Sequence, residues 1–437
     1  MVSPRISNLK FSNHRPSYRR TLSRLLGCLS LGAFTFLAAC GGSSSSSNHS
    51  TTPPPTGNNV QAIAVNGGPV AGQIYPDAAF TSVTVCAPGT STCQTIDGIL
   101  VDTGSSGLRI LASALTGTFP NVAISGNNAY NCVNFIDGSY LWGPMVQADI
   151  EMGGEKTSSA SVQLIENPSG FTVPVACSQG GVNEDTQSGL GANGILGVGM
   201  EPTDCYIDGQ SPCVSTPGFS PPPAYFTCGT TGNCQTSFVP LAQQLINPVV
   251  GFSTDNNGVI IELQSVDGAA ATATGSMIFG IGTQSNNALG SATVFTVDPT
   301  DDNFTTNFNN QSLIDSFIDS GSNGLFFQDA IPQCSVDTGF YCPSSTLNLS
   351  AQNVGANDAQ STVNFGVDNA IQTNSSDTAF ANLAGPAPGA SGTCSTNNPN
   401  ACIFDWGLPF FFGRNVYVAI DGQAAPSGTP AAPWWAY

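Results

Sequence analysis

Two related stretches decide the fold of this 437-residue sequence. The first reads Ile99-Leu-Val-Asp-Thr-Gly-Ser-Ser-Gly-Leu108, and the second reads Ser316-Phe-Ile-Asp-Ser-Gly-Ser-Asn-Gly-Leu325. Each is an apolar strand followed by Asp-Thr/Ser-Gly-Ser, one further residue and Gly-Leu. The copies lie roughly 200 residues apart, a spacing that suits two related lobes of domain size.

The two loops supply a pair of carboxyl groups. An apolar strand delivers Asp102 to its C-terminal end in the first copy and Asp319 in the second. If the loops face each other, the two carboxyl groups come within hydrogen-bonding distance and share one proton. Such a dyad can hold a water molecule, deprotonate it for attack on an amide carbonyl and protonate the carbonyl oxygen. Thr103 and Ser320 would brace the loops, and Gly104 and Gly321 would allow a tight backbone close to the carboxyl groups. Ser105 and Ser322 would donate hydrogen bonds to the carboxylates.

The histidine content narrows the chemistry. The only two histidines, His14 and His49, precede everything that reads as folded. A Ser-His-Asp triad, a Cys-His pair and a histidine metal site are therefore excluded from the folded part. Lys156 is the only lysine there, so a Ser-Lys dyad has a single candidate. The chemistry must come mainly from carboxylates and hydroxyls, and we expect no metal and no cofactor.

The charge excludes another class of protein. Beyond residue 40, three basic residues (Arg109, Lys156 and Arg414) stand against 28 acidic ones. Such a surface repels phosphate backbones, so we expect no nucleic-acid partner. Hydrophobic residues make up 40% of the chain, which is enough for a packed core.

Short β-branched or aromatic runs between Gly, Asn, Asp, Ser and Pro clusters fill the chain after residue 60. This pattern predicts an all-β protein. Pro240 to Ile246 is the best helix candidate, being short and amphipathic. The clearest strand candidates are residues 81–86, 98–102, 259–263, 277–280 and 416–420.

Together these features resemble the pepsin-like aspartic proteases. Residues 193–199 resemble the strand that threads past the first catalytic loop in that family, 275–280 its early second-lobe strand, and 406–421 its penultimate strand–helix–strand. The resemblance covers most of residues 75–425 and implies a bilobal acid-protease fold with a central cleft. We place the N-terminal lobe at 61–257 and the C-terminal lobe at 258–437. The full chain also looks like a bacterial lipoprotein family of unknown function.

The sequence departs from the family pattern at the hairpin that covers the cleft. The family carries a Tyr there, and the register here places Phe135 or Ile136 at that position. Tyr140 and Trp142 are nearby and either bind substrate through a shifted turn or merely pack the hairpin.

Two further departures concern Arg109 and the second lobe. Arg109 stands where the family has an aromatic residue. It pairs with a substrate carboxylate, lowers the pKa of a dyad carboxyl group or forms a structural ion pair with a local Asp or Glu. In the second lobe, Gly407-Leu408-Pro409 is expected to replace the family's apolar-apolar-Gly, so that proline alters the support of the Asp319 loop.

The N-terminus reads as an export signal. Residues 1–40 combine a basic stretch, an apolar run and Leu37-Ala-Ala-Cys40, which resembles a bacterial lipobox lipidated on Cys40. Residues 41–60 form a Ser/Thr/Pro/Gly tether. We therefore expect a monomer that is lipid-anchored in the bacterial cell envelope, in the periplasm or on the outer membrane.

Twelve cysteines remain after Cys28 and Cys40, an even number that suits up to six disulfides in an exported protein. Proximity suggests five pairs and leaves a sixth: Cys86/Cys93, Cys205/Cys213, Cys228/Cys234, Cys334/Cys342, Cys394/Cys402 and, by elimination, Cys132/Cys177.

We therefore predict an envelope-anchored aspartic endopeptidase that acts on polypeptides through Asp102 and Asp319. An alternative is a catalytically silent pepsin-like protein that binds peptide or glycan in its cleft. A carboxylate-based glycosidase is a weaker alternative, because it needs carboxyl groups about 5–9 Å apart.

Overall fold

The computed structural model describes residues 57–206, 210–215, 218, 220–230, 232–336, 339–372 and 376–437. The predicted signal peptide, including Cys40, and most of the predicted tether lie outside these residues. Within the described part, none of the helices is long and apolar enough to cross a membrane.

The described residues form β-strands joined by loops, and each described helix is a single turn. The strands of the first half are β1 (Val60–Val65), β2 (Ala79–Cys86), β3 (Cys93–Asp102), β4 (Ser106–Leu111), β5 (Ala123–Ile124), β6 (Asn127–Asn134), β7 (Ser139–Met152), β8 (Glu155–Ile165), β9 (Val182–Asn183), β10 (Gly194–Val198), β11 (Tyr225–Cys228) and β12 (Cys234–Thr236). The short helices are α1 (Val175–Ser178), α2 (Gln187–Leu190), η1 (Leu241–Gln243), η2 (Pro248–Gly251), η3 (Ala370–Gln372), η4 (Pro399–Cys402) and η5 (Leu408–Phe411).

The second half adds two groups of strands. One group joins the first-half strands in a 17-stranded hydrogen-bonded network: β13 (Gly258–Leu263), β15 (Ala273–Phe279), β16 (Val294–Thr296), β25 (Asn415–Ala419) and β26 (Trp434–Ala436). The other forms a separate seven-stranded sheet: β17 (Phe304–Phe308), β18 (Gln311–Ile318), β19 (Leu325–Phe327), β20 (Leu347–Val354), β21 (Gln360–Val367), β23 (Ala384–Gly385) and β24 (Ile403–Trp406). β14 (Ala269–Ala270) and β22 (Ala379–Phe380) pair with each other.

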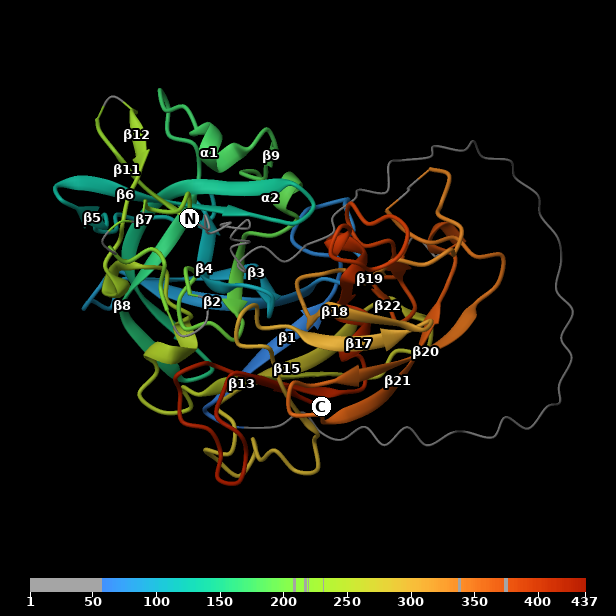
Figure 1. The fold of residues 1–437 in the computed structure, drawn as a ribbon. Coiled ribbons are helices and arrows are strands. Elements are labelled where there is room, and N and C mark those ends of the chain that lie inside the picture. The colour runs from blue at the N-terminus through green and yellow to red at the C-terminus, as the bar shows by residue number, and fades with distance from the viewer. Residues whose placement is uncertain are drawn as a thin grey trace, which may run out of the picture.

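The two halves lie side by side, with the blue and green strands on one side and the orange and red strands on the other (Figure 1). β1 joins them, because it pairs with β2 of the first half and, over its whole length, with β15 of the second. This confirms an all-β fold with two lobes. The lobe boundary at 257/258 stays a prediction, since β13 and β15 share the sheet of the first lobe.

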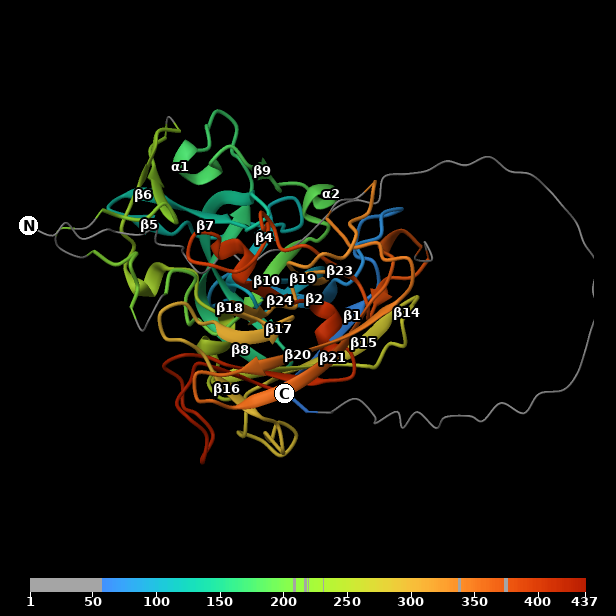
Figure 2. The ribbon, with the colours of Figure 1, turned by 45° about the vertical axis from the view of Figure 1, so that its right-hand side comes forward.

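Each half contains the same threaded motif. In the first, β10 runs between β3, to which it is parallel, and β4, to which it is antiparallel. In the second, β24 runs between β18, to which it is parallel, and β19, to which it is antiparallel. β10 and β24 lie near the centre of the molecule, where the halves meet (Figure 2). The motif therefore delivers the end of β3 and the end of β18 to the junction.

Both strands that reach the junction become buried as they approach it. β3 is partly exposed along its first residues and then fully buried over Ile99–Asp102, where β2 and β10 flank it on both sides. In the second half, Phe404 stacks on Phe327 at 4.8 Å and on Trp406 at 4.1 Å between ring centroids. Stacked aromatic pairs of this kind add about 0.5–1.5 kcal/mol beyond the area that they bury.

A second contact between the halves involves a buried aspartate. Asp77 Oδ1 accepts a hydrogen bond from the Phe380 N–H at 2.7 Å, and the Asp77 N–H donates to the Thr378 carbonyl at 2.8 Å. Thr378 Oγ1 donates to the carbonyl of Val65 at 3.0 Å. Burial raises the pKa of Asp77 well above the usual aspartate value.

All six predicted disulfides are present: Cys86–Cys93, Cys132–Cys177, Cys205–Cys213, Cys228–Cys234, Cys334–Cys342 and Cys394–Cys402. The helix predicted over Pro240 to Ile246 is wrong. Only the 3-10 turn η1 forms there, because Gln244 is extended and its side chain bonds to Ser211 and the Val239 carbonyl.

Candidate active site

Each of the two Asp-Thr/Ser-Gly loops is held by the other. The Thr103 N–H donates to Ser320 Oγ at 3.1 Å, and the Ser320 N–H donates to Thr103 Oγ1 at 2.9 Å. The same hydroxyls donate to the backbone just before the opposite aspartate, Thr103 to Ile318 at 3.1 Å and Ser320 to Val101 at 2.8 Å. These four buried bonds are related by an approximate two-fold axis, and they fix the loops face to face.

This brace places each aspartate against the opposite loop. A Cβ atom added to Gly104 would lie 2.6 Å from Asp319 Cγ, and one added to Gly321 would lie 2.7 Å from Asp102 Oδ1. Real Cβ atoms do not approach so closely, so both positions require glycine. Asp102 is 5% exposed and Asp319 is fully buried. The two carboxyl groups therefore form a pair at the junction of the halves.

The two carboxyl groups have matching hydrogen-bond donors from their own loops. The Gly104 N–H donates to Asp102 Oδ1 at 2.8 Å, and Ser105 Oγ donates to Asp102 Oδ2 at 2.5 Å. In the second loop, the Gly321 N–H donates to Asp319 Oδ1 at 2.8 Å and Ser322 Oγ to Asp319 Oδ2 at 3.0 Å. Each carboxyl group is therefore held by one backbone N–H and one serine hydroxyl of its own loop.

Electrostatics favour a proton on the pair. Burial raises the pKa of Asp319 well above the usual aspartate value. The charges of Asp102 and Asp405 and the hydrogen bond with Asp102 raise it further, against the opposing effect of the Gly321 N–H. The pair therefore keeps a proton at pH values where an ordinary aspartate has lost it.

Asp405 was not among the residues singled out from the sequence. It lies in β24, opposite Phe317 of β18 and Phe326 of β19, and is fully buried. The corresponding residue of the first half is Ile195, opposite Arg109. The available signal was compositional: Asp405 is the one charged residue between Asp377 and Arg414.

The expected replacement of the apolar-apolar-Gly segment by Gly407-Leu408-Pro409 is wrong. The register aligns Trp406 with Ile318, and the Asp319 N–H donates to the Trp406 carbonyl at 3.0 Å, so Gly407 follows at the level of Asp319. Pro409 comes later, in the first turn of η5, where a missing N–H removes no helical bond.

The hairpin between β6 and β7 reaches from the first half to the second. Its turn is closed by hydrogen bonds from the Phe135 N–H to the Ser139 carbonyl at 2.8 Å and from the Gly138 N–H to the Phe135 carbonyl at 2.9 Å. Phe135 packs in a first-half cluster that includes Ile195. Ile136 instead packs on a second-half cluster that includes Phe317.

Tyr140 and Trp142 do not line this site. Trp142 is fully buried, stacked on Tyr130 and edge-on to Phe226, with 5.2 Å between centroids in both pairs. Tyr140 is 7% exposed and belongs to the same cluster. Both side chains pack the hairpin, which is the second of the two roles that the sequence left open.

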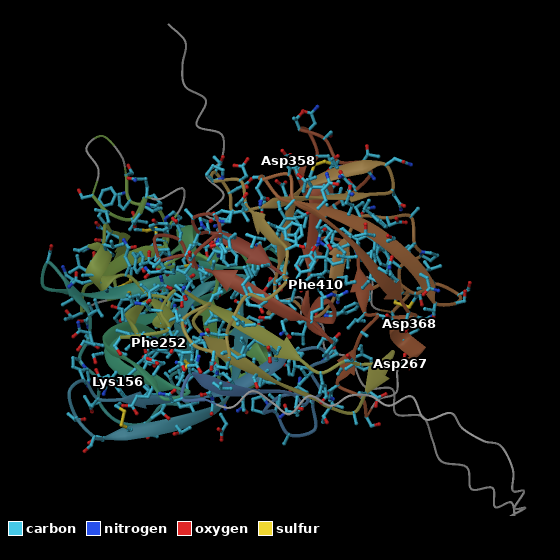
Figure 3. All side chains as sticks on the ribbon, turned by 90° about the horizontal axis from the view of Figure 1, so that it is seen from below. Lys156, Phe252, Asp267, Asp358, Asp368 and Phe410 are labelled. Carbon is cyan, nitrogen blue, oxygen red and sulfur yellow. A yellow bond between two sulfur atoms is a disulfide. The ribbon has the colours of Figure 1, made fainter. Side chains whose placement is uncertain are left out.

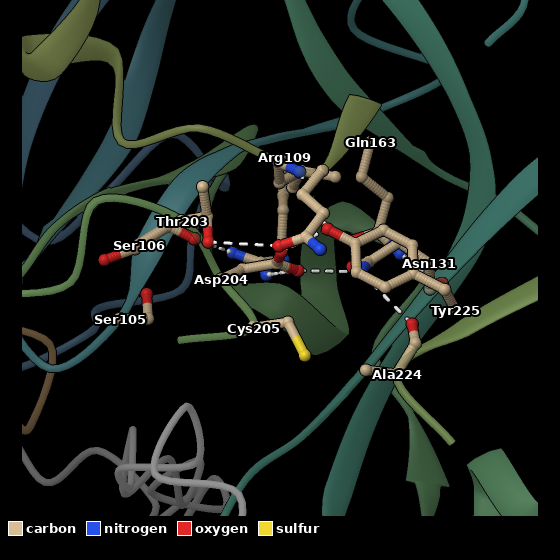
Figure 4. Close-up of polar contacts among 12 residues, drawn as sticks. Ser105, Ser106, Arg109, Asn131, Gln163, Thr203, Asp204, Cys205, Ala224 and Tyr225 are labelled. Carbon is tan, nitrogen blue, oxygen red and sulfur yellow. Dashed lines mark hydrogen bonds and ion pairs between the residues drawn. The ribbon is translucent and has the colours of Figure 1, made fainter. Parts of the chain in front are cut away.

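Arg109 also lies away from the pair, in a buried polar network (Figure 4). Its Nη2 is 3.2 Å from Asp204 Oδ2, and its Nη1 donates to the Ser106 carbonyl at 2.9 Å. Asp204 also accepts bonds from Asn131 Nδ2 at 2.7 Å and from the Tyr225 hydroxyl. The guanidinium is 1% exposed, so the structure places Arg109 in an ion pair and not against substrate.

Lys156 pairs with two carboxylates at the edge of the first half. Its Nζ contacts Asp149 at 3.0 Å and Glu151 at 3.2 Å, and the side chain is 41% exposed at the edge of the first half, whereas Phe410 lies inside the second (Figure 3). Among the described residues, no group of three His, Cys, Asp or Glu side chains could hold a metal ion.

A family model described as "Protein of unknown function (DUF3443)" matches residues 55–437. The chain belongs to this family. No curated protein matches the sequence of this DUF3443 member. Among solved structures, an aspartic proteinase from Irpex lacteus is similar at a TM-score of 0.44 and 14% identity, over 82% of this chain and 94% of that one. This similarity carries no argument about chemistry, so the reaction must be inferred from the geometry of the site itself.

Proposed function

We propose that this protein is an aspartic endopeptidase whose dyad is Asp102 and Asp319. Asp319, whose pKa is raised, holds the shared proton, and Asp102 accepts a proton from a water molecule held between them. The water oxygen attacks the carbonyl carbon of the peptide bond while the Asp319 proton passes to the carbonyl oxygen. As this gem-diol intermediate collapses, the C–N bond breaks, Asp102 returns its proton to the departing nitrogen, and Asp319 takes a proton back from one hydroxyl, which leaves a carboxylic acid, an amine and the original dyad.

One observation carries the proposal: each aspartate lies against the glycine of the opposite loop. The Cβ positions of Gly104 and Gly321 fall 2.6–2.7 Å from the facing carboxyl groups. Incidental Asp-Gly turns have no reason to be cross-braced over 217 residues of sequence by paired threonine and serine bonds. Carboxyl groups this close suit a shared proton better than the wider separation that glycoside hydrolysis needs.

The test is peptide cleavage by the purified protein with Cys40 replaced by serine and its disulfides oxidised. We expect cleavage of a mixed peptide library between pH 3 and 7, lost in Asp102→Asn and inhibited by pepstatin. Circular dichroism and thermal unfolding should show that Asp102→Asn stays folded. Equal cleavage by Asp102→Asn would refute the proposal.

A catalytically silent peptide-binding protein is the second candidate, and the hairpin favours it. Phe135 lacks the hydroxyl that a Tyr would place over the cleft, and Ile136 packs on the second half. Tight peptide binding without turnover, unaffected by Asp102→Asn, would decide for this candidate.

We further propose that the protein acts in the bacterial envelope as a lipid-anchored monomer, on the strength of the lipobox-like segment before Cys40. Metabolic labelling with a palmitate analogue should mark the wild-type chain and not Cys40→Ser.

A further inference from the structure

Arg414 differs from the other two basic residues that follow residue 40. Arg109 and Lys156 both form ion pairs with carboxylates of the first half. Among the described residues, no carboxylate forms an ion pair with Arg414, although the chain contains 28 acidic residues. The guanidinium of Arg414 is therefore a cation without an anionic partner in a strongly acidic protein.

The Arg414 side chain is held in place by Phe410, which lies inside the second half (Figure 3). Its Nη1 donates to the Phe410 carbonyl at 2.6 Å, and its Cζ lies 4.6 Å from the centroid of the Phe410 ring. Burial lowers the pKa of Arg414, an effect that the nearby Tyr437 opposes. A cation that is partly removed from water and has no counter-ion favours the binding of an anion.

Arg414 lines a cavity of about 490 Å³ in the second half, bounded by β20, β21 and η5. Much of the lining is apolar. Val266, Leu349, Phe365 and Ala381 pack on the main hydrophobic core, yet each keeps part of its surface exposed. Cavities of roughly 300–1,000 Å³ with mainly apolar walls and a few polar groups are typical of small-molecule sites.

The polar part of the lining is neutral apart from Arg414. Asn348 of β20 and Asn364 of β21 line the cavity and expose their amide side chains. Asn364 pairs with Ser350, two residues after Asn348, so the three side chains share one face of the hairpin. Among the described residues, no acidic side chain lines the cavity. The cavity therefore combines one cation, neutral hydrogen-bonding groups and apolar surface.

This combination matches a ligand with a single carboxylate and an apolar body. The guanidinium fork of one arginine binds one carboxylate through two parallel hydrogen bonds. A phosphate group carries nearly two negative charges at neutral pH and would meet only one cation here. A neutral apolar molecule would cover the walls but leave the guanidinium without a counter-ion.

We propose that this cavity binds a small carboxylate ligand whose apolar body covers Leu349 and Phe365 and whose carboxylate pairs with Arg414. Neither Asp102 nor Asp319 lines the cavity. The inference therefore goes beyond the proposed peptidase function and does not depend on it.

The test is isothermal titration calorimetry at pH 7 on the oxidised protein with Cys40 replaced by serine. Three probes are compared: octanoate, octanamide, which has the same chain without the charge, and acetate, which has the charge without the chain. We expect octanoate to bind about 10- to 100-fold more tightly than octanamide, the range of a charge-assisted contact. Acetate should bind more weakly than octanoate by at least the same factor, because it leaves the apolar walls uncovered.

Two variants locate the binding site. Arg414→Met removes the charge at similar side-chain length and should lower octanoate affinity about 10- to 100-fold, with octanamide affinity nearly unchanged. Asn364→Asp places a negative charge in the lining and should weaken octanoate binding. Thr362→Asp is the matched control, because Thr362 is exposed on the same strand but lies outside the lining. It should weaken octanoate binding less than Asn364→Asp does.

The comparison of probes on the wild-type chain needs no variant to fold. Equal affinity for octanoate and octanamide overturns the inference, as does the absence of octanoate binding or acetate binding as tight as that of octanoate. A folded Arg414→Met variant that binds octanoate as tightly as wild type also overturns it, because the carboxylate is then bound elsewhere. Loss of peptide cleavage in any form of the protein has no bearing on these outcomes.

Discussion

Replacing Gly104 by alanine should strongly lower the rate of peptide cleavage by the dyad while leaving the protein folded. The added Cβ would lie 2.6 Å from Asp319 Cγ, whereas ordinary contact begins at 3.4 Å, so the two atoms must separate by about 0.8 Å. The Asp319 carboxyl group cannot move away freely, because the Gly321 N–H and Ser322 Oγ donate hydrogen bonds to it. A misplacement of about 1 Å in a catalytic group costs about 100-fold in rate.

The assay is kcat/KM on a library-derived peptide, together with urea unfolding. We expect Gly104→Ala to lose about 100-fold in kcat/KM, and to lose only the roughly 1–3 kcal/mol of stability that overpacking costs. Gly229→Ala is the matched control, because a Cβ there meets nothing within 4 Å and the residue has no left-handed backbone. If Gly104→Ala keeps kcat/KM within about threefold of wild type, the carboxyl groups are not held as described and the geometric reasoning fails.

Three further changes probe the scaffold. Asp204→Ala should destabilise the fold by about 3–5 kcal/mol in urea unfolding, because it leaves the buried Arg109 guanidinium without its carboxylate. Replacing Cys132 and Cys177 by serine should cost about 4 kcal/mol, the chain-entropy value for a sequence separation of 45 residues. Asp77→Asn should flatten the dependence of stability on pH. Because the pKa of Asp77 is raised in the folded state, its protonated form adds to the free energy of unfolding below about pH 4, and this contribution is lost as the pH rises toward the folded pKa. The melting temperature of wild type should therefore fall more than that of the variant between pH 4 and 7.

Matched controls accompany these changes. Glu151→Gln removes only the exposed ion pair with Lys156 and should leave the urea midpoint unchanged. Removing Cys228–Cys234, with a separation of 6 residues, should cost only about 2 kcal/mol. An Asp204→Ala variant as stable as wild type would show that the ion pair is dispensable. Parallel pH curves for wild type and Asp77→Asn would show that the Asp77 carboxyl titrates normally.

The parts of the fold predictable from sequence are those that local pattern determines. The loops at Asp102 and Asp319 could be recognised because an apolar strand and a short polar turn are contiguous in sequence. Five disulfides could be paired by proximity because each joins cysteines at most 8 residues apart, and Cys132–Cys177 followed by elimination.

What could not be predicted depends on register between distant segments. The direction of Asp405 follows from parallel pairing of β24 with β18, about 90 residues earlier, and a shift of one residue would turn it to the opposite face. Arg109 could not be assigned for the same reason, since its partner Asp204 comes from a loop 95 residues away. Trp142 was compatible with the cleft or the core until its neighbours Tyr130 and Phe226 were placed.

The pairing of β1 with β15 bears on how the molecule comes apart. Every disulfide closes a loop within one half, the widest spanning 45 residues, whereas the pairing of Val60 with Ile278 joins strands from opposite halves. No described covalent link other than the chain itself ties one half to the other. Oxidation can therefore finish inside each half before the halves meet, and a reductant loosens loops without touching the seam. Among the described residues, hydrogen bonds and packing alone hold the seam that sets the two aspartates side by side, so a change that weakens these contacts acts on the dyad even with all six disulfides intact.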